Sequence, residues 1–430
     1  MTGEAPSGDG LDTYLEHFAE TAFFPDNPDR IGIAVSGGSD SMAALHLFAR
    51  AAPLRGCTVH AVTVNHGLRV EAADEAAHVA TVCARLGVGH ATVRWEHGEI
   101  TGNLQDKARR ARYRLIAEWA NANNIGHVAL GHTADDQAET FLMRLARGAG
   151  VDGLSGMRHE FHHDGVRFDR PFLSHTRADL REYLIRNDVT WIDDPSNDDR
   201  SYQRVKARKA LTLLAPLGIT VETLSRVSQN MYSARWALEH YTYEKSKKMA
   251  EQDAGDLILT RLPMPPVPDE IERRLLVAGL MWVSGAEYPP RDSALNEMDV
   301  AFLSSDTHTL SGCLVTLAKP EGILNQKLRI TREWNAVKDM RCATDELWDG
   351  RWQLSGPHAP DLEIRALGAA GLADCPDWRA TGRPRATLLA SPAVWRGETL
   401  VSAPIAGYGN GWQAELGATR NDFAAFLIGR

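Results

Sequence analysis

The residues best suited to chemistry in this sequence form one hexapeptide, Ser36-Gly37-Gly38-Ser39-Asp40-Ser41. Its glycines let the backbone turn tightly and approach a ligand closely. N–H groups at the start of the following helix attract an anion, and Ser39 and Ser41 add hydroxyl donors. Asp40 suits an anion site only if a cation such as Mg²⁺ is also bound. The Gly-Lys-[Ser/Thr] ending of a Walker A loop is missing. The alternative to a ligand site is an ordinary turn in which Asp40 is the helix N-cap. We favour the ligand site because all six residues suit it.

A pair of carboxylates, Asp136 and Glu139, lies about a hundred residues further along the chain. Residues three apart share a helix face, so the pair could hold an ammonium group or Mg²⁺. Acidic residues also favour the first turn of a helix for purely structural reasons. His132 precedes this helix, at the end of a predicted strand.

Two basic clusters are candidates for phosphate contact. Arg109 and Arg112 share one helix face, and guanidinium groups bind phosphate well. Arg204 and Arg208 belong to a second cluster with Lys206 and Lys209. A solvated helix face is the alternative for both clusters. We favour it for the two lysines.

Other polar residues carry weaker signals. His159, His162 and His163 match no standard metal spacing, so we expect a flexible loop there. The chain has five cysteines and no Cys-x-x-Cys pair, which argues against a disulfide framework and a zinc cluster. A reducing cytoplasm is the simplest compartment.

Short apolar runs alternate with helical patterns through the first third of the chain, after a leading helix at 11–24. This alternation predicts an α/β fold in which a parallel sheet carries helices on both faces. Ligands bind such sheets at the carboxyl ends of the strands, where the hexapeptide and His132 lie. The expected strands are 31–35, 58–64, 90–95 and 127–130, and the expected helices are 42–51, 72–86, 104–121 and 135–147.

The rest of the chain is less regular. A turn is expected at 193–197, a long helical stretch at 202–248, a proline-rich boundary at 262–268 and a helix at 269–284. Short β-like runs such as 328–330 follow. We predict a tail and leading helix at 1–24, a catalytic domain at 25–215, a helical linker and substrate-binding domain at 216–335, and a smaller α+β domain at 336–430.

Composition limits the class of protein. The formal net charge of −9 counts mildly against a nucleic-acid binder, although local basic patches can still carry phosphate contacts. No apolar run approaches the length of a membrane span. Residues 1–10 lack the basic start and apolar stretch of a signal peptide.

The hexapeptide after the first strand resembles the PP-loop signature of N-type ATP pyrophosphatases. Those enzymes cleave ATP between its α and β phosphates and transfer AMP to an oxygen. The order of further motifs is similar to that of the tRNA(Ile)-lysidine synthase family. The resemblance is dense from about 30 to 210 and weaker beyond. Its motifs are at 64–69, 108–113, 131–140, 147–150 and 194–197, then 288–291, 309–313 and 348–351.

This resemblance implies a reaction. ATP would adenylate the C2 oxygen of the wobble cytidine in the AUA-reading isoleucine tRNA, whose anticodon is CAU. L-lysine would then attack C2 and release AMP. The implied cofactors are ATP and Mg²⁺, the latter near Asp40. The implied roles are catalysis by Asp40, Arg112, His132 and Arg208; ATP binding by 36–41 and His66; lysine binding by Asp136 and Glu139; and tRNA or phosphate contact by Arg109, Arg112, Arg204 and Arg208.

One position departs from the family pattern. The usual motif is Arg-Asn-x-x-Arg, but Val205 stands where the amide is expected, which puts any contact of that amide in doubt. The resemblance also implies that the C-terminal domains grip the tRNA. A homodimer is a candidate assembly that the sequence does not decide.

Three other functions fit the sequence less well. A PP-loop tRNA thiolase needs catalytic or cluster-binding cysteines, and Cys57 and Cys83 are unpaired in predicted strand and helix. A glutamine-using synthetase needs a glutaminase domain or an N-terminal cysteine, and the chain begins Met1-Thr2. A non-catalytic RNA-binding relative has no need of the intact loop and acidic pair.

Overall fold

The fold is described from a computed structural model. It covers the chain except residues 1–8, 22–25, 27, 68–71, 99–101, 103, 194–202, 261–266, 319–325, 419 and 429–430. The chain divides into two compact units, the first ending at Arg235 and the second beginning at Trp236.

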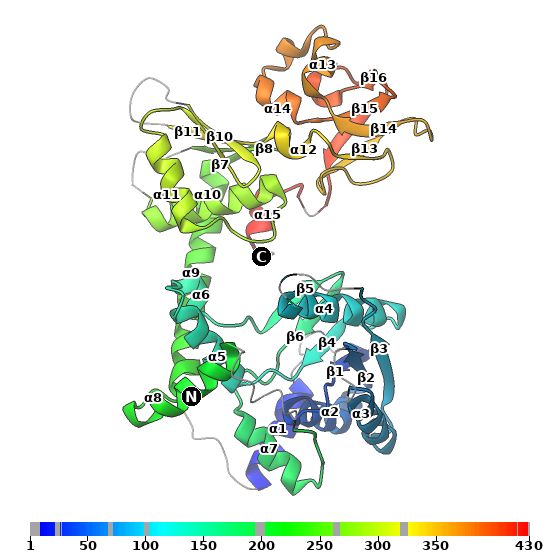
Figure 1. Cartoon of the computed structure of the whole chain (residues 1–430), viewed down its shortest axis with the longest axis vertical. Coiled ribbons are helices and arrows are strands. Elements are labelled where there is room, and N and C mark those ends of the chain that lie inside the picture. The colour runs from blue at the N-terminus through cyan, green and yellow to red at the C-terminus, as the bar shows by residue number, and fades with distance from the viewer. Residues whose placement is uncertain are drawn as a thin grey trace. The chain divides into compact units, whose positions relative to one another are not determined.

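A six-stranded sheet with the order β3-β2-β1-β4-β6-β5 forms the centre of the first unit (Figure 1). The neighbouring strands are parallel except β5, which runs antiparallel to β6. The expected parallel sheet is therefore confirmed, with one antiparallel edge strand added. The strands are β1 (Arg30–Ala34), β2 (Thr58–Asn65), β3 (Gly89–Arg94), β4 (His127–Leu130), β5 (Glu160–His163) and β6 (Val166–Asp169).

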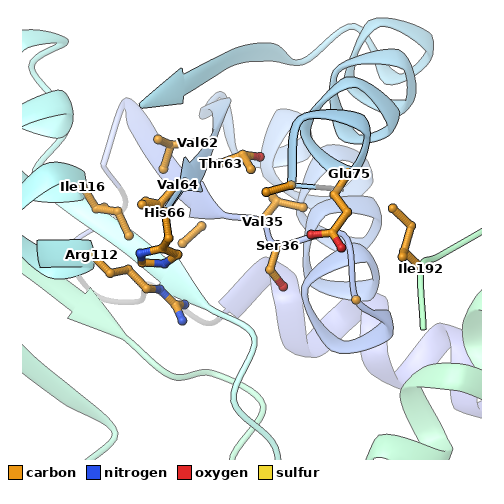
Figure 2. A pocket seen from close by; sticks show the side chains of 13 residues that line it. Val35, Ser36, Val62, Thr63, Val64, His66, Glu75, Arg112, Ile116 and Ile192 are labelled. Atoms are coloured by element: carbon orange, nitrogen blue, oxygen red, sulfur yellow. The ribbon is translucent and has the colours of Figure 1, made fainter. Parts of the chain in front are cut away.

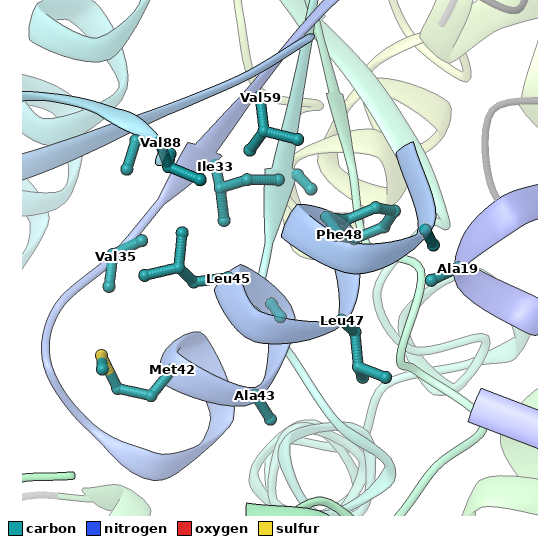
Figure 3. Close-up of a cluster of buried hydrophobic side chains, with 14 of the residues drawn as sticks. Ala19, Ile33, Val35, Met42, Ala43, Leu45, Leu47, Phe48, Val59 and Val88 are labelled. Atoms are coloured by element: carbon teal, nitrogen blue, oxygen red, sulfur yellow. The ribbon is translucent and has the colours of Figure 1, made fainter. Parts of the chain in front are cut away.

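Helices cover both faces of this sheet because its central strands, β1 and β4, are buried on both sides. One face packs against α1, α2, α3 and α7, with Phe48 and Leu45 of α2 at the centre of the cluster in Figure 3. The other face packs against α4 through Ile116 and Ala117. The helices of this unit are α1 (Asp9–Thr21), α2 (Ser39–Ala51), α3 (Ala72–Leu86), α4 (Leu104–Ala122), α5 (Ala134–Leu145), α6 (Val151–Leu154), α7 (Arg177–Arg186) and α8 (Gln203–Leu214), followed by α9 (Val221–Met249), which continues into the second unit.

The strand order reverses beside β1. Strand β2 pairs with β1 on one side and β4 pairs with it on the other. The carboxyl ends of the strands beside such a reversal are where open α/β sheets bind ligands.

Three local predictions were wrong. Helix α2 begins at Ser39, so the second half of the hexapeptide is helical rather than a turn. His162 and His163, expected in a flexible loop with His159, lie in β5 of the β5–β6 hairpin, because Phe161 and Phe168 stack with ring centroids 5.0 Å apart and Phe168 is fully buried. The long helix expected at 202–248 is broken at Gly218, which has a φ of +78°.

The second unit contains two further layers, each with its own core. A five-stranded sheet, β7-β8-β11-β10-β9, packs against α10 (Asp269–Ser284) around the fully buried Trp282. A four-stranded sheet, β12-β14-β15-β16, and the pair β13-β17 enclose a second core around Trp348. The predicted helix at 269–284 is confirmed, while the predicted boundary at 262–268 lies mostly outside the described residues.

The bounds of the remaining elements are β7 (Ala250–Asp253), β8 (Asp256–Thr260), β9 (Thr307–Leu310), β10 (Cys313–Ala318), β11 (Lys327–Arg332), β12 (Arg341–Ala343), β13 (Trp352–Ser355), β14 (Glu363–Ala366), β15 (Pro392–Arg396), β16 (Thr399–Ser402), β17 (Gln413–Leu416), α11 (Asp292–Ala301), α12 (Trp334–Val337), α13 (Gly368–Ala373), α14 (Arg385–Leu389) and α15 (Phe423–Ile428). No single helix among the described residues is long and apolar enough to cross a membrane. Two consecutive helical segments, at 203–217 and 221–249, together have the length and composition of a span, but the chain bends by 99° between them.

Candidate active site

The hexapeptide forms the loop between β1 and α2, at the strand-order reversal. Gly37 has a φ of +89°, a left-handed conformation that favours glycine. The Ser41 hydroxyl accepts from the Ser36 N–H at 3.1 Å and donates to the Gly38 carbonyl at 3.0 Å, so it braces the loop. No side chain among the described residues caps the first turn of α2. The N–H groups of this first turn are therefore available to bind an anion.

Gly131, which directly follows β4, lets the chain pass close to the first turn of α2. A Cβ atom at this position would lie 2.9 Å from the backbone of Asp40 and from Cα of Ser41. Real Cβ atoms do not come so close to backbone atoms, so only glycine allows this packing. The glycine that begins the motif at 131–140 therefore shapes the hexapeptide loop.

A cavity of about 320 Å³ opens beside the loop (Figure 2). Apolar side chains and a few polar groups line it together, as is usual for a nucleotide-sized ligand. The polar side chains are those of Ser36, Thr63, His66, Glu75 and Arg112, and the apolar lining includes Val35, Val62, Val64, Ile116 and Ile192. The Ile192 N–H donates to the Gly37 carbonyl at 2.9 Å, so a segment distant in sequence closes over the loop.

His66 and Arg112 lie next to each other on one side of this cavity (Figure 2). The His66 ring packs edge-to-face against Trp95, with centroids 6.0 Å apart. Burial, with help from Arg112, lowers the pKa of His66. The ring is therefore neutral at neutral pH and can accept or donate a hydrogen bond to a base.

Asp136 is buried at the N-terminus of α5. Its Oδ2 accepts from the Thr133 N–H at 3.0 Å and from the Thr133 hydroxyl at 3.2 Å, so it helps cap its own helix. Burial alone would raise the pKa of Asp136, but His132, Arg204 and the Thr133 N–H lower it overall. Asp136 is therefore an anion with its other oxygen, Oδ1, directed toward Arg204 at 3.6 Å.

Glu139 lies one helical turn further along α5 and is 1% exposed. Its Oε1 accepts from Arg208 Nε at 3.0 Å. Its Oε2 is buried and has no hydrogen-bond partner among the described residues. Burial and the neighbouring Asp136 raise the pKa of Glu139 although Arg208 opposes them. An unpartnered buried carboxylate oxygen is a site for a donor from outside the protein.

His132 precedes these carboxylates. Burial lowers the pKa of its ring to about 3, and Asp136 opposes this shift only in part. The imidazole is neutral at neutral pH. It can therefore donate or accept a hydrogen bond and position a substrate, but it is not a cation there.

Arg177 is a site residue that the sequence did not reveal. It is the first residue of α7, and its Nε donates to Asp40 Oδ2 at 2.9 Å. Its terminal nitrogens lie 3.9 Å from Asp136 and 3.9 Å from Glu139. The capping box formed by Thr176 and Asp179 was a readable sign of a helix start. Only the fold brings this arginine to the carboxylates.

Only some of the predicted basic residues lie close to the two carboxylates. Arg109 is exposed over the ring of Tyr113, while Arg204 and Arg208 of α8 approach Asp136 and Glu139. Lys206 and Lys209 are exposed, as expected. Val205 is 5% exposed and packs inward from α8, so an apolar residue suits this position.

The carboxylates offer little for a resident metal ion. The described residues contain no group of three or more His, Cys, Asp or Glu side chains that could hold a metal. Asp40 is bonded to Arg177, and burial raises the pKa of Asp40. A metal ion bound here would need most of its ligands from a substrate, as Mg²⁺ does when it accompanies phosphates.

Comparisons with known proteins agree with this geometry. The PP-loop domain family matches residues 11–214. The tRNA(Ile)-lysidine synthase of Ruegeria pomeroyi is 49% identical over 416 residues, which is 96% of this chain and 97% of that protein. The tRNA(Ile)-lysidine synthase of Wolbachia pipientis wMel is 36% identical over 71% of this chain and 72% of that protein.

Proposed function

This chain belongs to the tRNA(Ile)-lysidine synthase family, and from that premise we propose how its residues perform the family's reaction. The chain is a ligase that forms a carbon–nitrogen bond. It uses ATP to adenylate the C2 oxygen of the wobble cytidine of isoleucine tRNA. The lysine amine then attacks C2, and AMP leaves with that oxygen.

The nucleotide lies at the carboxyl ends of β1 and β2, beside the loop at 36–41. The loop at 36–41 receives the phosphates through the N–H groups of α2, and the cavity lined by His66 and Arg112 receives the adenosine. Asp40 would be the residue that holds a Mg²⁺ ion accompanying the phosphates, and that ion would supply neutralisation of phosphate charge. Positioning and charge stabilisation supply most of the rate of the adenylation step.

The lysine ammonium lies between Asp136 and Glu139. The observation that carries this assignment is Glu139 Oε2, which is buried on the helix that follows β4 and accepts no hydrogen bond from the part of the chain that the structure describes. The neutral His132 and the guanidinium of Arg112 position the cytidine and its adenylate. Arg109, Arg204 and Arg208 contact tRNA phosphates.

We propose that the region after 335 grips the tRNA, that the tRNA carries the CAU anticodon, and that the reaction takes place in the cytoplasm. A homodimer is a further proposal, which sedimentation of the purified protein tests. The thiolase alternative is disfavoured because Cys57 and Cys83 are buried, and burial raises the pKa of Cys83 to about 11.

The test is incorporation of labelled lysine into RNA. Purified protein receives ATP, Mg²⁺, labelled lysine and either isoleucine tRNA or methionine tRNA with the same CAU anticodon. We expect pyrophosphate release and label in the isoleucine tRNA only. Asp136→Asn abolishes incorporation, whereas Asp106→Asn, an exposed carboxylate paired with Arg110 on α4, does not. Pyrophosphate release without lysine incorporation overturns the amine assignment but leaves the ATP site intact. No binding of ATP favours the non-catalytic relative.

A further inference from the structure

Arg177 lies between the loop at 36–41 and the carboxylates of α5. Its backbone N–H donates to Asp135 at 2.7 Å and its Nε donates to Asp40 at 2.9 Å. Nη2 lies 3.9 Å from Asp136 Oδ2, and Nη1 lies 3.9 Å from Glu139 Oε1. One guanidinium therefore spans the loop that we assign to ATP and the carboxylates that we assign to lysine.

The two kinds of contact differ in strength. The bond to Asp40 has hydrogen-bond geometry, whereas 3.9 Å is too long for a hydrogen bond and leaves only charge attraction. The side chain of Arg177 is 21% exposed, and those of Asp136 and Glu139 are 11% and 1% exposed. Attraction between charges screened so little is strong at this distance. Arg177 thus neutralises the amine site without occupying Glu139 Oε2.

The other cations near the site do not share this position. Arg204 and Arg208 also approach Asp136 and Glu139, but their side chains are 49% and 39% exposed. Among the ion pairs of the described residues, only Arg177 joins Asp40 to Asp136 and Glu139.

We propose that Arg177 is a positioning residue that couples ATP binding to lysine binding, an inference that rests on the proposed function. Without nucleotide, its guanidinium competes with the lysine ammonium for Asp136 and Glu139. Phosphates at the loop add negative charge beside Asp40 and draw the guanidinium toward them, since arginine binds phosphate with its planar fork. The two carboxylates then lose a competing cation and bind lysine more tightly.

The test compares lysine affinities by calorimetry on the full chain. The probe is L-lysine, with and without α,β-methylene-ATP and Mg²⁺, because that analogue cannot be cleaved at the reacting bond. We expect the analogue to tighten lysine binding by about fivefold or more in the unmodified protein. In Arg177→Gln, we expect lysine without nucleotide to bind at least as tightly as in the unmodified protein. The analogue should then change the affinity by less than about twofold.

Two further variants make the test specific. Arg186→Gln removes an arginine of the same helix that pairs with Asp12 and Glu182, and it should keep the full coupling. Arg177→Lys keeps a positive charge for folding but lacks the fork that spans three carboxylates, so its coupling should also fall. It replaces the glutamine variant if that protein does not fold.

The possible outcomes separate this inference from the proposed function. Full coupling in the Arg177 variants, or none in the unmodified protein that binds both ligands, overturns the inference alone. Failure of the unmodified protein to bind lysine with or without the analogue overturns the proposed function, and the coupling with it. Loss of coupling in the Arg177 variants, with coupling kept in Arg186→Gln, supports the inference.

Discussion

Glu139 shares only one of its two carboxylate oxygens with Arg208. Oε1 accepts from Arg208 Nε at 3.0 Å, while Oε2 is buried without a hydrogen-bond partner among the described residues. An anionic oxygen removed from water in this way is unfavourable unless a ligand supplies a donor. The ammonium group of the proposed lysine substrate would supply such a donor.

Replacing this carboxylate tests its role directly. In Glu139→Gln, we expect kcat/KM for lysine to fall by about 100-fold or more, because a buried ion pair with the substrate is lost. Affinity for an ATP analogue should change by less than about twofold, since the cavity beside His66 is untouched. Glu118→Gln, an exposed residue paired with Arg114 on α4, is the control. Equal lysine kinetics in the two variants would contradict the assignment.

A glycine substitution tests the packing of the loop. Gly131→Ala places a Cβ atom 2.9 Å from the backbone of Asp40, so the loop must move. We expect ATP affinity, measured by titration with the analogue, to fall by at least about tenfold, in line with the sensitivity of catalytic sites to small displacements. Gly126→Ala, just before β4, meets nothing within 4 Å and should bind nucleotide normally. Unchanged affinity in Gly131→Ala would show that the loop tolerates displacement.

A buried carboxylate makes the stability of the second unit depend on pH. Asp256 accepts from Thr331 at 2.9 Å, from Thr387 at 2.6 Å and from Arg329 at 3.0 Å, yet burial raises its pKa to about 6. Because the pKa is higher in the folded state, the stabilising contribution is complete below about pH 4 and is lost as the pH rises through about 6. We expect Asp256→Asn to gain about 3 kcal/mol relative to the unmodified protein between pH 4 and pH 7.

The measurement is denaturant unfolding of both proteins across this pH range. The quantity compared is the change in their difference with pH, not the absolute stability of either protein, because other groups titrate in both. A difference that stays constant from pH 4 to pH 7 would show that Asp256 titrates normally.

The core beneath the ATP loop should be sensitive to truncation. Phe48 is fully buried and its ring lies 5.9 Å from that of Phe172 (its neighbours are shown in Figure 3). We expect Phe48→Ala to lower the free energy of unfolding of the first unit by about 3–5 kcal/mol. Leu54→Ala, at a side chain that is 72% exposed, should change it by less than about 0.5 kcal/mol. Similar losses in both variants would argue against tight packing around α2.

The sequence by itself determined β1 to β4 of the first sheet and the positions of the motif residues. Strands such as β1 are buried on both faces and read as short apolar runs, and α3 and α10 begin and end where their patterns predict. The motif residues could be located because a glycine turn, a capping aspartate and a basic helix face are each recognised from residues a few positions apart. These are properties of neighbours along the chain, which the sequence displays directly.

Only the tertiary structure decided which distant groups meet. The β5–β6 hairpin is held by the stacking of Phe161 on Phe168 and by the pairing of β6 with β4. Neither contact is visible in the polar residues of this segment, which is why the sequence predicted a loop. Arg177 is about 140 positions from Asp40 and about 40 from Asp136, and no local spacing links three such residues. Charge attraction acts through space rather than along the chain, so the cation that balances the carboxylates became visible only once the sheet had brought their helices together.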